Sequence, residues 1–201
     1  MKTRILLPLA LLLVATSAAQ AQYSEWYWGG SYSTALPLGD QKTFTGGDGG
    51  QSFSFRGVTI EGRKILNENV SAGLSFGWHV FNSQGDQTNT IGDVTIGGNQ
   101  FRYTNAFPLF ANMHYYFGQR GAVRPYVGAN VGTIYAERRV DISLISLSQK
   151  KWHLAFAPEV GVAFPLGWVV RGVIAARYHY GVKAGDFTPQ YFSFSFGIAS
   201  R

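Results

Sequence analysis

The chain has 201 residues, of which 46% are hydrophobic, 14% are charged and none is cysteine. The hydrophobic content excludes a disordered chain, and the charged fraction is far below the roughly 25% of ordinary soluble domains. The lack of cysteine excludes a disulfide scaffold and a thiolate metal site. The length predicts one domain. The net charge of +6 is modest and scattered, and it does not indicate a nucleic-acid partner.

The N-terminal segment has the order of a secretory signal peptide. Lys2 and Arg4 precede an apolar run over residues 5–15, and Ala19-Gln20-Ala21 follows with small residues at the positions where signal peptidases cut. The apolar run is about half of the roughly 20 residues that a membrane-spanning helix needs, so an uncleaved anchor is the weaker alternative. We expect a signal peptide over residues 1–21, cleaved after Ala21, and a mature domain over residues 22–201.

The mature chain alternates apolar and polar residues with a period of two, which is the pattern of β-strands. The alternation is clearest over residues 70–80, where Leu74 and Trp78 share one face and Ser71 and Ser75 share the other. A bulge is expected near Gly57, where the phase breaks. The pattern predicts eight strands, at residues 24–36, 52–63, 70–80, 101–117, 125–137, 152–164, 168–180 and 191–199.

The links between these strands alternate between long and short. Long polar links follow every odd-numbered strand, at residues 39–51, 82–100, 138–151 and 181–190. Short links follow the second, fourth and sixth strands, at residues 67–69, 118–124 and 165–167. Barrels of the outer membrane have this asymmetry, with long extracellular loops and short periplasmic turns. With eight strands, both termini are expected in the periplasm.

The two faces of the strands differ in the way a membrane barrel requires. One face carries mostly Gly, Ala and Ser with a few ionisable residues, and the other carries Trp, Phe, Leu and Val. A water-soluble barrel, the main alternative, would have Lys and Glu outside and large apolar side chains inside. Arg or Lys facing the middle of a bilayer costs roughly 2–4 kcal/mol, so the uncharged face is expected to meet lipid. The expected fold is all-β: an eight-stranded antiparallel up-and-down transmembrane β-barrel.

Two neighbouring segments carry a family resemblance. Residues 107–117 read FPLFANMHYYF and residues 124–132 read RPYVGANVG. They resemble paired strands of the small outer-membrane barrels of the OmpW/OmpA type. The resemblance implies the outer membrane of a Gram-negative bacterium, insertion by the barrel-assembly machinery and, in some members, passage or binding of small hydrophobic molecules.

The ionisable residues of the inward face suggest a packed lumen. The short link at 165–167 brings Glu159 beside the following strand, so Arg171 or Arg177 is expected to pair with it, because an unpaired buried carboxylate is costly. His153 and His179 are expected to join this lumen network. A metal site is the alternative reading of the histidines. We expect none, because their strands do not bring them into a tight cluster.

A lipid-modifying enzyme is the remaining class of function that a barrel of this size suggests. Barrel deacylases of this size are typified by a His-x-Ser arrangement with a nearby carboxylate, which activates the serine hydroxyl. None of the residues two positions after the four histidines is serine; they are Phe81, Tyr116, Ala155 and Gly181. We therefore expect no enzymatic activity and no cofactor. Residues 46–50, GGDGG, are expected to form a flexible loop tip.

Four basic residues flank an apolar stretch in the third long link: Arg138, Arg139, Lys150 and Lys151. They are expected to contact phosphates of lipopolysaccharide, although four solvated charges would fit the sequence equally well. The expected function is a structural or surface-interaction role with a side-chain-packed lumen. The alternatives are a narrow conduit or binder for small hydrophobic molecules and, with less support, the lipid-modifying enzyme.

Overall fold

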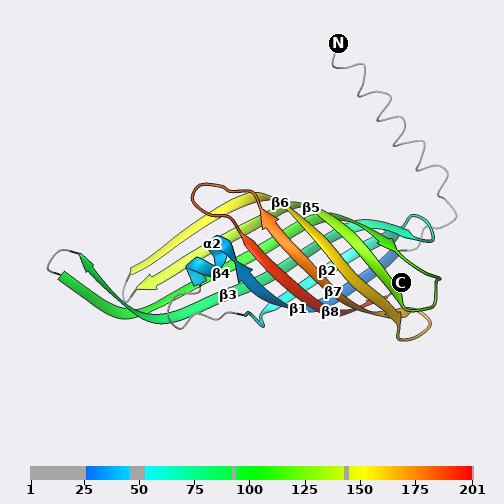
Figure 1. Cartoon of the computed structure of the whole chain (residues 1–201), viewed down its shortest axis with the longest axis horizontal. Helices are drawn as coiled ribbons and strands as arrows, with labels where there is room; N and C mark the ends of the chain where they lie inside the picture. The colour runs from blue at the N-terminus through cyan, green and yellow to red at the C-terminus, as the bar shows by residue number, and fades with distance from the viewer. Residues whose placement is uncertain (1–25, 46–52, 92–93, 143–144, 201) are drawn as a thin grey trace, which may run out of the picture.

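The computed structural model describes residues 26–45, 53–91, 94–142 and 145–200 (Figure 1). Its strands form one closed antiparallel barrel in chain order, which confirms the predicted fold. The strands are β1 Trp26–Leu38, β2 Gly57–Ile65, β3 Val70–Ile91, β4 Val94–Tyr116, β5 Arg124–Ile142, β6 Ile145–Pro165, β7 Val170–Gly181 and β8 Gln190–Ser200, with one helix, α2, at Gly39–Thr45. Pairing of β1 with β8 closes the barrel. The expected signal peptide and the 46–50 loop tip lie outside the described residues.

The alternation in sequence becomes an alternation between the outside and the lumen. On β6, Leu154 is 70% exposed, whereas the neighbouring His153 is 1% exposed. On β5, Val131 is 64% exposed and Asn130 is 1% exposed. Successive side chains of a strand point to opposite faces, so each strand presents an apolar outer row and a buried inner row. In the described part of the chain, no helix is long and apolar enough to cross a membrane.

The two ends of the barrel differ. At one end, here called the turn end, short connections join β2 to β3, β4 to β5 and β6 to β7. Gly118 and Gly121 lie in the β4–β5 turn with φ of +83° and +89°, a conformation that glycine adopts without steric cost. The opposite end, here called the hairpin end, carries the connections predicted to be long, and α2 lies there beside β1 and β8 (Figure 1).

Two of the predicted long loops are strands instead. The β3–β4 ladder continues through the 82–100 region to the Ile91–Val94 pair, and the β5–β6 ladder continues through the 138–151 region to the Ile142–Ile145 pair. Figure 1 shows the β3–β4 hairpin reaching far beyond the other strands. The 82–100 stretch is largely polar in both phases, so the apolar alternation that revealed the other strands is missing from it. The 138–151 stretch does alternate from Val140 to Leu147, but the basic residues at both of its ends favoured a loop. The 39–51 link begins with α2 rather than with an irregular loop.

Two prolines interrupt the ladders of the barrel wall. β3 and β4 are in register on both sides of Pro108 but have no pairs at Gly77 and Trp78. β6 and β7 similarly have no pairs between Phe156–Tyr180 and Glu159–Arg177, the stretch that contains Pro158. A proline has no N–H to donate, so each of these gaps lacks a ladder hydrogen bond.

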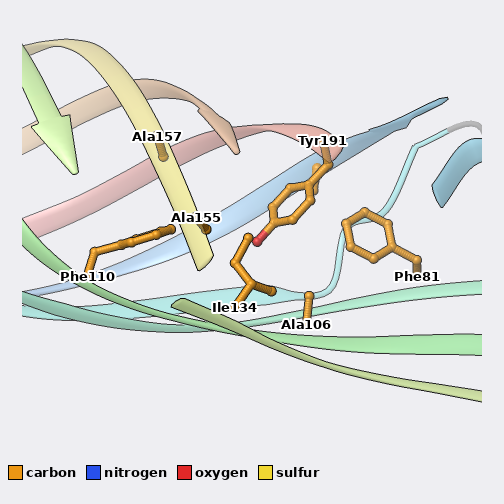
Figure 2. Packing of buried hydrophobic residues seen from close by; sticks show 8 residues of the cluster. Phe81, Ala106, Phe110, Ile134, Ala155, Ala157 and Tyr191 are labelled. Carbon is orange, nitrogen blue, oxygen red and sulfur yellow. The ribbon is translucent and has the colours of Figure 1, made fainter. Parts of the chain in front are cut away.

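An apolar cluster occupies the lumen toward the hairpin end. Tyr191 and Ile134 are 0% exposed and Phe81 is 2% exposed. Figure 2 shows the ring of Tyr191 directed across the lumen toward Ile134, with Phe81 beside it. Small residues complete the cluster and leave room for the large ones: Ala35, Ala106, Ala155 and Ala157, with Phe110 at its edge.

The asymmetry of the two ends gives a topology that can be measured. Asn89→Cys, on the β3 extension, should react with an impermeant thiol reagent on intact cells, whereas Gly167→Cys, in the β6–β7 turn, should not. Gly167 has open space around its Cβ position, so the substitution is sterically free. Both cysteines should react once the outer membrane is permeabilised, and the native chain has no cysteine to interfere. If only Gly167→Cys reacted on intact cells, the barrel would have the opposite orientation to the one predicted.

Candidate functional site

A carboxylate lies in the middle of the lumen and is bound by an arginine of the next strand. Glu159 of β6 is 3% exposed and pairs in register with Arg177 of β7. Arg177 approaches the Oε2 atom of Glu159 with its Nη2 at 2.6 Å and donates a hydrogen bond to it from Nε at 2.9 Å. Two nitrogens on one carboxylate make a strong, directional ion pair.

Residues of β4 and β5 complete the binding of this carboxylate. The hydroxyl of Tyr126 donates to Oε1 of Glu159 at 2.8 Å, and Nδ2 of Asn130 donates to Oε2 at 3.1 Å. Nε2 of His114 lies 3.4 Å from Oε2. Each of these side chains is almost fully buried. The carboxylate therefore exchanges its hydration for a set of fixed protein partners.

A second arginine, from β2, extends the group toward the turn end. Arg63 donates from Nη2 to Oε2 of Glu61 at 2.7 Å and from Nη1 to the hydroxyl of Tyr116 at 2.7 Å. The same Nη2 lies 3.8 Å from Oε1 of Glu159. We call the whole set the Glu159 network: Glu61, Arg63, His114, Tyr126, Asn130, Glu159 and Arg177. Its members come from β2, β4, β5, β6 and β7, so it cross-links five of the strands.

The sequence pointed to part of this network only. Arg177 is the arginine that meets Glu159, while Arg171 lies six positions away, about 20 Å along β7 at the strand rise. Arg171 pairs in register with Pro165, and its guanidinium lies over the ring of Tyr27 at 5.9 Å. Arg63 and Glu61 were missed because the phase of the second strand was obscured before Gly57, where β2 begins.

A layer of rings lies beside the network, toward the hairpin end. The rings of His179 and Tyr191 are stacked with centroids 4.2 Å apart, and His79 lies 5.5 Å from His179. Phe81 packs on Tyr191 at 5.1 Å, and Phe110 lies 5.8 Å from His179. We call these five residues the aromatic layer. The expectation that β3 and β7 keep their histidines apart is wrong, because the lumen is narrow enough for side chains from opposite walls to touch.

Two features of the buried histidines bear on chemistry. Nε2 of His179 shares a hydrogen bond of 2.9 Å with the hydroxyl of Ser193, but its Nδ1, which a carboxylate would orient in a catalytic triad, has no hydrogen-bond partner among the described residues. His153 instead shares a 3.0 Å hydrogen bond with the carbonyl of Val182 and packs against Phe187. Within the described residues, no group of three or more His, Asp or Glu side chains could hold a metal ion.

The four basic residues expected to contact lipopolysaccharide do not form one surface. Arg138 lies in the mouth of the barrel, with its guanidinium over the rings of Phe187 at 4.2 Å and Phe44 at 5.0 Å. Lys151 follows the same inward alternation and lies beside Gly185 of the β7–β8 loop. In that loop, hydrogen bonds from its own backbone and from Gln149 lower the pKa of Asp186, which keeps an anion near these two cations.

The other two basic residues point outward, each with an acidic partner. Nε of Arg139 lies 2.9 Å from Oδ1 of Asp141, and Nζ of Lys150 lies 3.1 Å from Oε1 of Glu137. The side chains of Arg139 and Lys150 are 42% and 54% exposed. The ladder period therefore divides the four cations into an inward pair and an outward pair.

Comparison with known proteins identifies the domain type. The model of the family described as the outer membrane protein β-barrel domain matches residues 7–199. Among solved structures, the neisserial surface protein A, NspA, has 15% identity and a TM-score of 0.57, over 87% of this chain and 96% of that chain. Ail, the attachment invasion locus protein of Yersinia pestis, has 14% identity and a TM-score of 0.48, over 88% and 96%. A search of the curated proteins found no match.

The Glu159 network predicts strong coupling between two substitutions. Arg177→Gln should destabilise the folded barrel by about 3–5 kcal/mol, because it leaves a buried carboxylate without its main partner. In a Glu159→Gln background the same change should cost much less, since the two side chains form one unit. The unfolding midpoint of the refolded protein in detergent measures both.

Arg171→Gln is the matched control on the same strand. It should have a small effect, and that effect should be equal in the wild-type and Glu159→Gln backgrounds, because Arg171 does not reach the carboxylate. Additive losses for Glu159→Gln and Arg177→Gln would contradict the network.

Proposed function

This chain belongs to the outer membrane protein β-barrel domain family, and we propose that it is a closed barrel that acts at the cell surface rather than by transport through its lumen. The observation that carries the proposal is the filling of the lumen at two successive levels. The Glu159 network joins five strands across the middle, and the aromatic layer fills the next level toward the hairpin end. A solute moving through would have to break buried charge-assisted hydrogen bonds.

The space that remains inside the barrel supports the same view. Two cavities toward the turn end measure about 50 and about 20 Å³, enough for a few water molecules. Both lie on the turn-end side of the aromatic layer, and Arg63 lines each of them. Neither is a continuous path past Tyr191 and His179, which are fully buried.

The proposed surface role rests on the extended β3–β4 and β5–β6 hairpins. β4 separates from β5 at the Gln100–Ile142 pair and continues six residues to Val94, so the β3–β4 hairpin extends about 20 Å beyond the β5–β6 hairpin. A two-stranded ribbon of this length carries a paired backbone well above the membrane. With the turn end in the periplasm, as family barrels have it, these hairpins are extracellular. Export through a signal peptide cleaved after Ala21, and insertion by the barrel-assembly machinery, are part of the proposal.

A conductance measurement tests the closed lumen. The refolded wild-type protein in a planar bilayer should give no stable channel, because the network and the aromatic layer leave no water-filled path. A Tyr191→Ala and Phe81→Ala double variant, which removes two large rings from one level, should conduct more often than the wild type. A steady ohmic conductance of the wild type, equal to that of the double variant, would contradict the proposal.

Binding of a small hydrophobic molecule is the second candidate, and one feature favours it. An open groove of about 660 Å³ lies on the outer face where the β1–β2 ladder ends at the Tyr32–Val58 pair, and the exposed Phe55 and Trp78 also line it. Saturable quenching of tryptophan fluorescence by a brominated alkane, lost in Trp78→Phe, would distinguish this function from a purely structural one.

The outward cations support contact with lipopolysaccharide. Arg139 and Lys150 lie on the outer face near the exposed Trp152, where phosphates of the outer leaflet are within reach. Replacing both by Gln should weaken association with lipopolysaccharide in detergent, by up to about 1 kcal/mol for each residue. The matched control replaces the inward pair, Arg138 and Lys151, which removes the same charge from the same strands. Equal weakening by both pairs would show a general charge effect and reject the contact.

A further inference from the structure

Basic side chains line the turn-end cavity in excess of acidic ones. This cavity of about 50 Å³ opens at the end of the lumen opposite the extended hairpins. Four arginines line it, from β2, the β4–β5 turn, β5 and β7, and Glu68 is the one carboxylate among its lining residues. The arginines are Arg63, Arg120, Arg124 and Arg171. Arg63, Arg124 and Arg171 lie far apart in the chain, so it is the closure of the barrel that brings their positive charges together.

Arg124 is buried and forms no salt bridge with a carboxylate among the described residues. It is 5% exposed, and its Nη2 donates to the backbone carbonyl of Glu68 at 2.8 Å. Its guanidinium lies over the ring of Tyr116 at 5.1 Å, and its Nε has no hydrogen-bond partner among the described residues. Burying a cation is costly unless an opposite charge compensates it. The salt bridges of the described residues do not include Arg124.

Arg171 is held in the same way. Its guanidinium lies over the ring of Tyr27, and it too is absent from the salt bridges of the described residues. Arg63 differs, because Glu61 and Glu159 neutralise it. Aromatic faces hold the guanidinium groups of Arg124 and Arg171, with a backbone carbonyl added for Arg124, and neither group takes part in a salt bridge among the described residues. This is the arrangement that an anion would complete.

The cavity has the size and the donors for a small oxyanion. Its volume corresponds to a few water molecules or one tetrahedral anion. Guanidinium groups offer paired N–H donors whose spacing matches two oxygens of a phosphate. Tyr116 accepts a hydrogen bond from Nη1 of Arg63 at 2.7 Å, so its own O–H proton is free to be donated into the cavity.

We propose that the turn-end cavity is a binding site for a phosphate-class oxyanion that enters from the periplasmic side, either free phosphate or the terminal phosphate of a soluble phosphorylated molecule. Arg124 and Arg171 supply guanidinium groups that form no salt bridge among the described residues, and Tyr116 supplies a neutral donor. The lining side chains face the lumen, so the ligand is a soluble anion rather than the headgroup of a surrounding lipid. The site is independent of the surface role proposed above, since it lies at the other end of the barrel.

The test titrates inorganic phosphate into the refolded wild-type protein in a maltoside detergent, which contains no phosphate. Phosphate should raise the unfolding midpoint in a saturable manner, and sodium chloride at the same ionic strength should not. The ³¹P resonance of phosphate should broaden on addition of protein. Arg124→Gln should weaken binding at least tenfold, and Arg171→Gln should weaken it several-fold.

Arg138→Gln, at the hairpin end, is the matched control and should bind phosphate as the wild type does. If Arg124→Gln does not refold, Arg171→Gln and the ³¹P linewidth decide, because Arg171 is only half-buried. A wild-type response no larger than that to sodium chloride, or an equal response in Arg171→Gln, would overturn the site. Displacement of bound phosphate by phosphatidylglycerol added to the micelles would assign the cations to lipid headgroups and overturn the soluble ligand.

Discussion

Closure of β1 onto β8 in a barrel of only eight strands determines most of what this molecule can do. Closure pairs the backbone groups that lipid would otherwise leave unsatisfied. It also makes the lumen so narrow that inward side chains of opposite strands touch, as His79 of β3 and His179 of β7 do. The chemistry of the interior therefore depends on which residues share a level of the barrel rather than on which share a strand.

The sequence predicted the number, order and faces of the strands because each strand inside the membrane must alternate. It could not predict the extensions of β3 and β4, where water replaces lipid and no apolar row is required. It missed the extensions of β5 and β6 for another reason, because their short apolar alternation lies between basic residues that favoured a loop. It left open whether Arg171 or Arg177 meets Glu159, because the predicted link at 165–167 is centred two residues before the axis of the observed pairing. Residues 159 and 177 are symmetric about residue 168, as are 165 and 171, so an antiparallel pairing about that axis selects Arg177.

Contacts across the lumen were the least accessible to sequence reasoning. Arg63 reaches Glu159 from β2, which is not a neighbour of β6 in the barrel. The inward face of β2 was hard to assign from the sequence, because the predicted strand began at residue 52 and the observed strand begins at Gly57. A period-two pattern reports the direction of a side chain but not its height in the barrel. The height of a side chain along the barrel axis depends on the stagger of the strands. Each turn adds a small register shift, and these shifts sum around the circumference.

The cations inside the barrel are stabilised in different ways at different levels. In the middle, Arg177 and Arg63 have carboxylates within reach. At the mouth, Arg138 lies over the rings of Phe187 and Phe44, and at the turn end Arg124 lies over Tyr116. Ion pairs with carboxylates thus hold the arginines in the middle of the lumen. Contacts with aromatic rings hold the arginines at the two ends, which are closer to water and solutes.

The two interruptions at Pro108 and Pro158 give the wall a mechanical character that a perfect ladder would lack. They fall in the β3–β4 and β6–β7 ladders, on well-separated parts of the circumference. Each interruption is a gap of two residue pairs in a ladder that continues on both sides, so the wall should bend more readily there than where the ladder is complete. Trp78 and His179 lie at these interruptions, one at each. Bending of the wall at these two places would therefore move the ring of His179 in the aromatic layer and the exposed ring of Trp78 on the outer face.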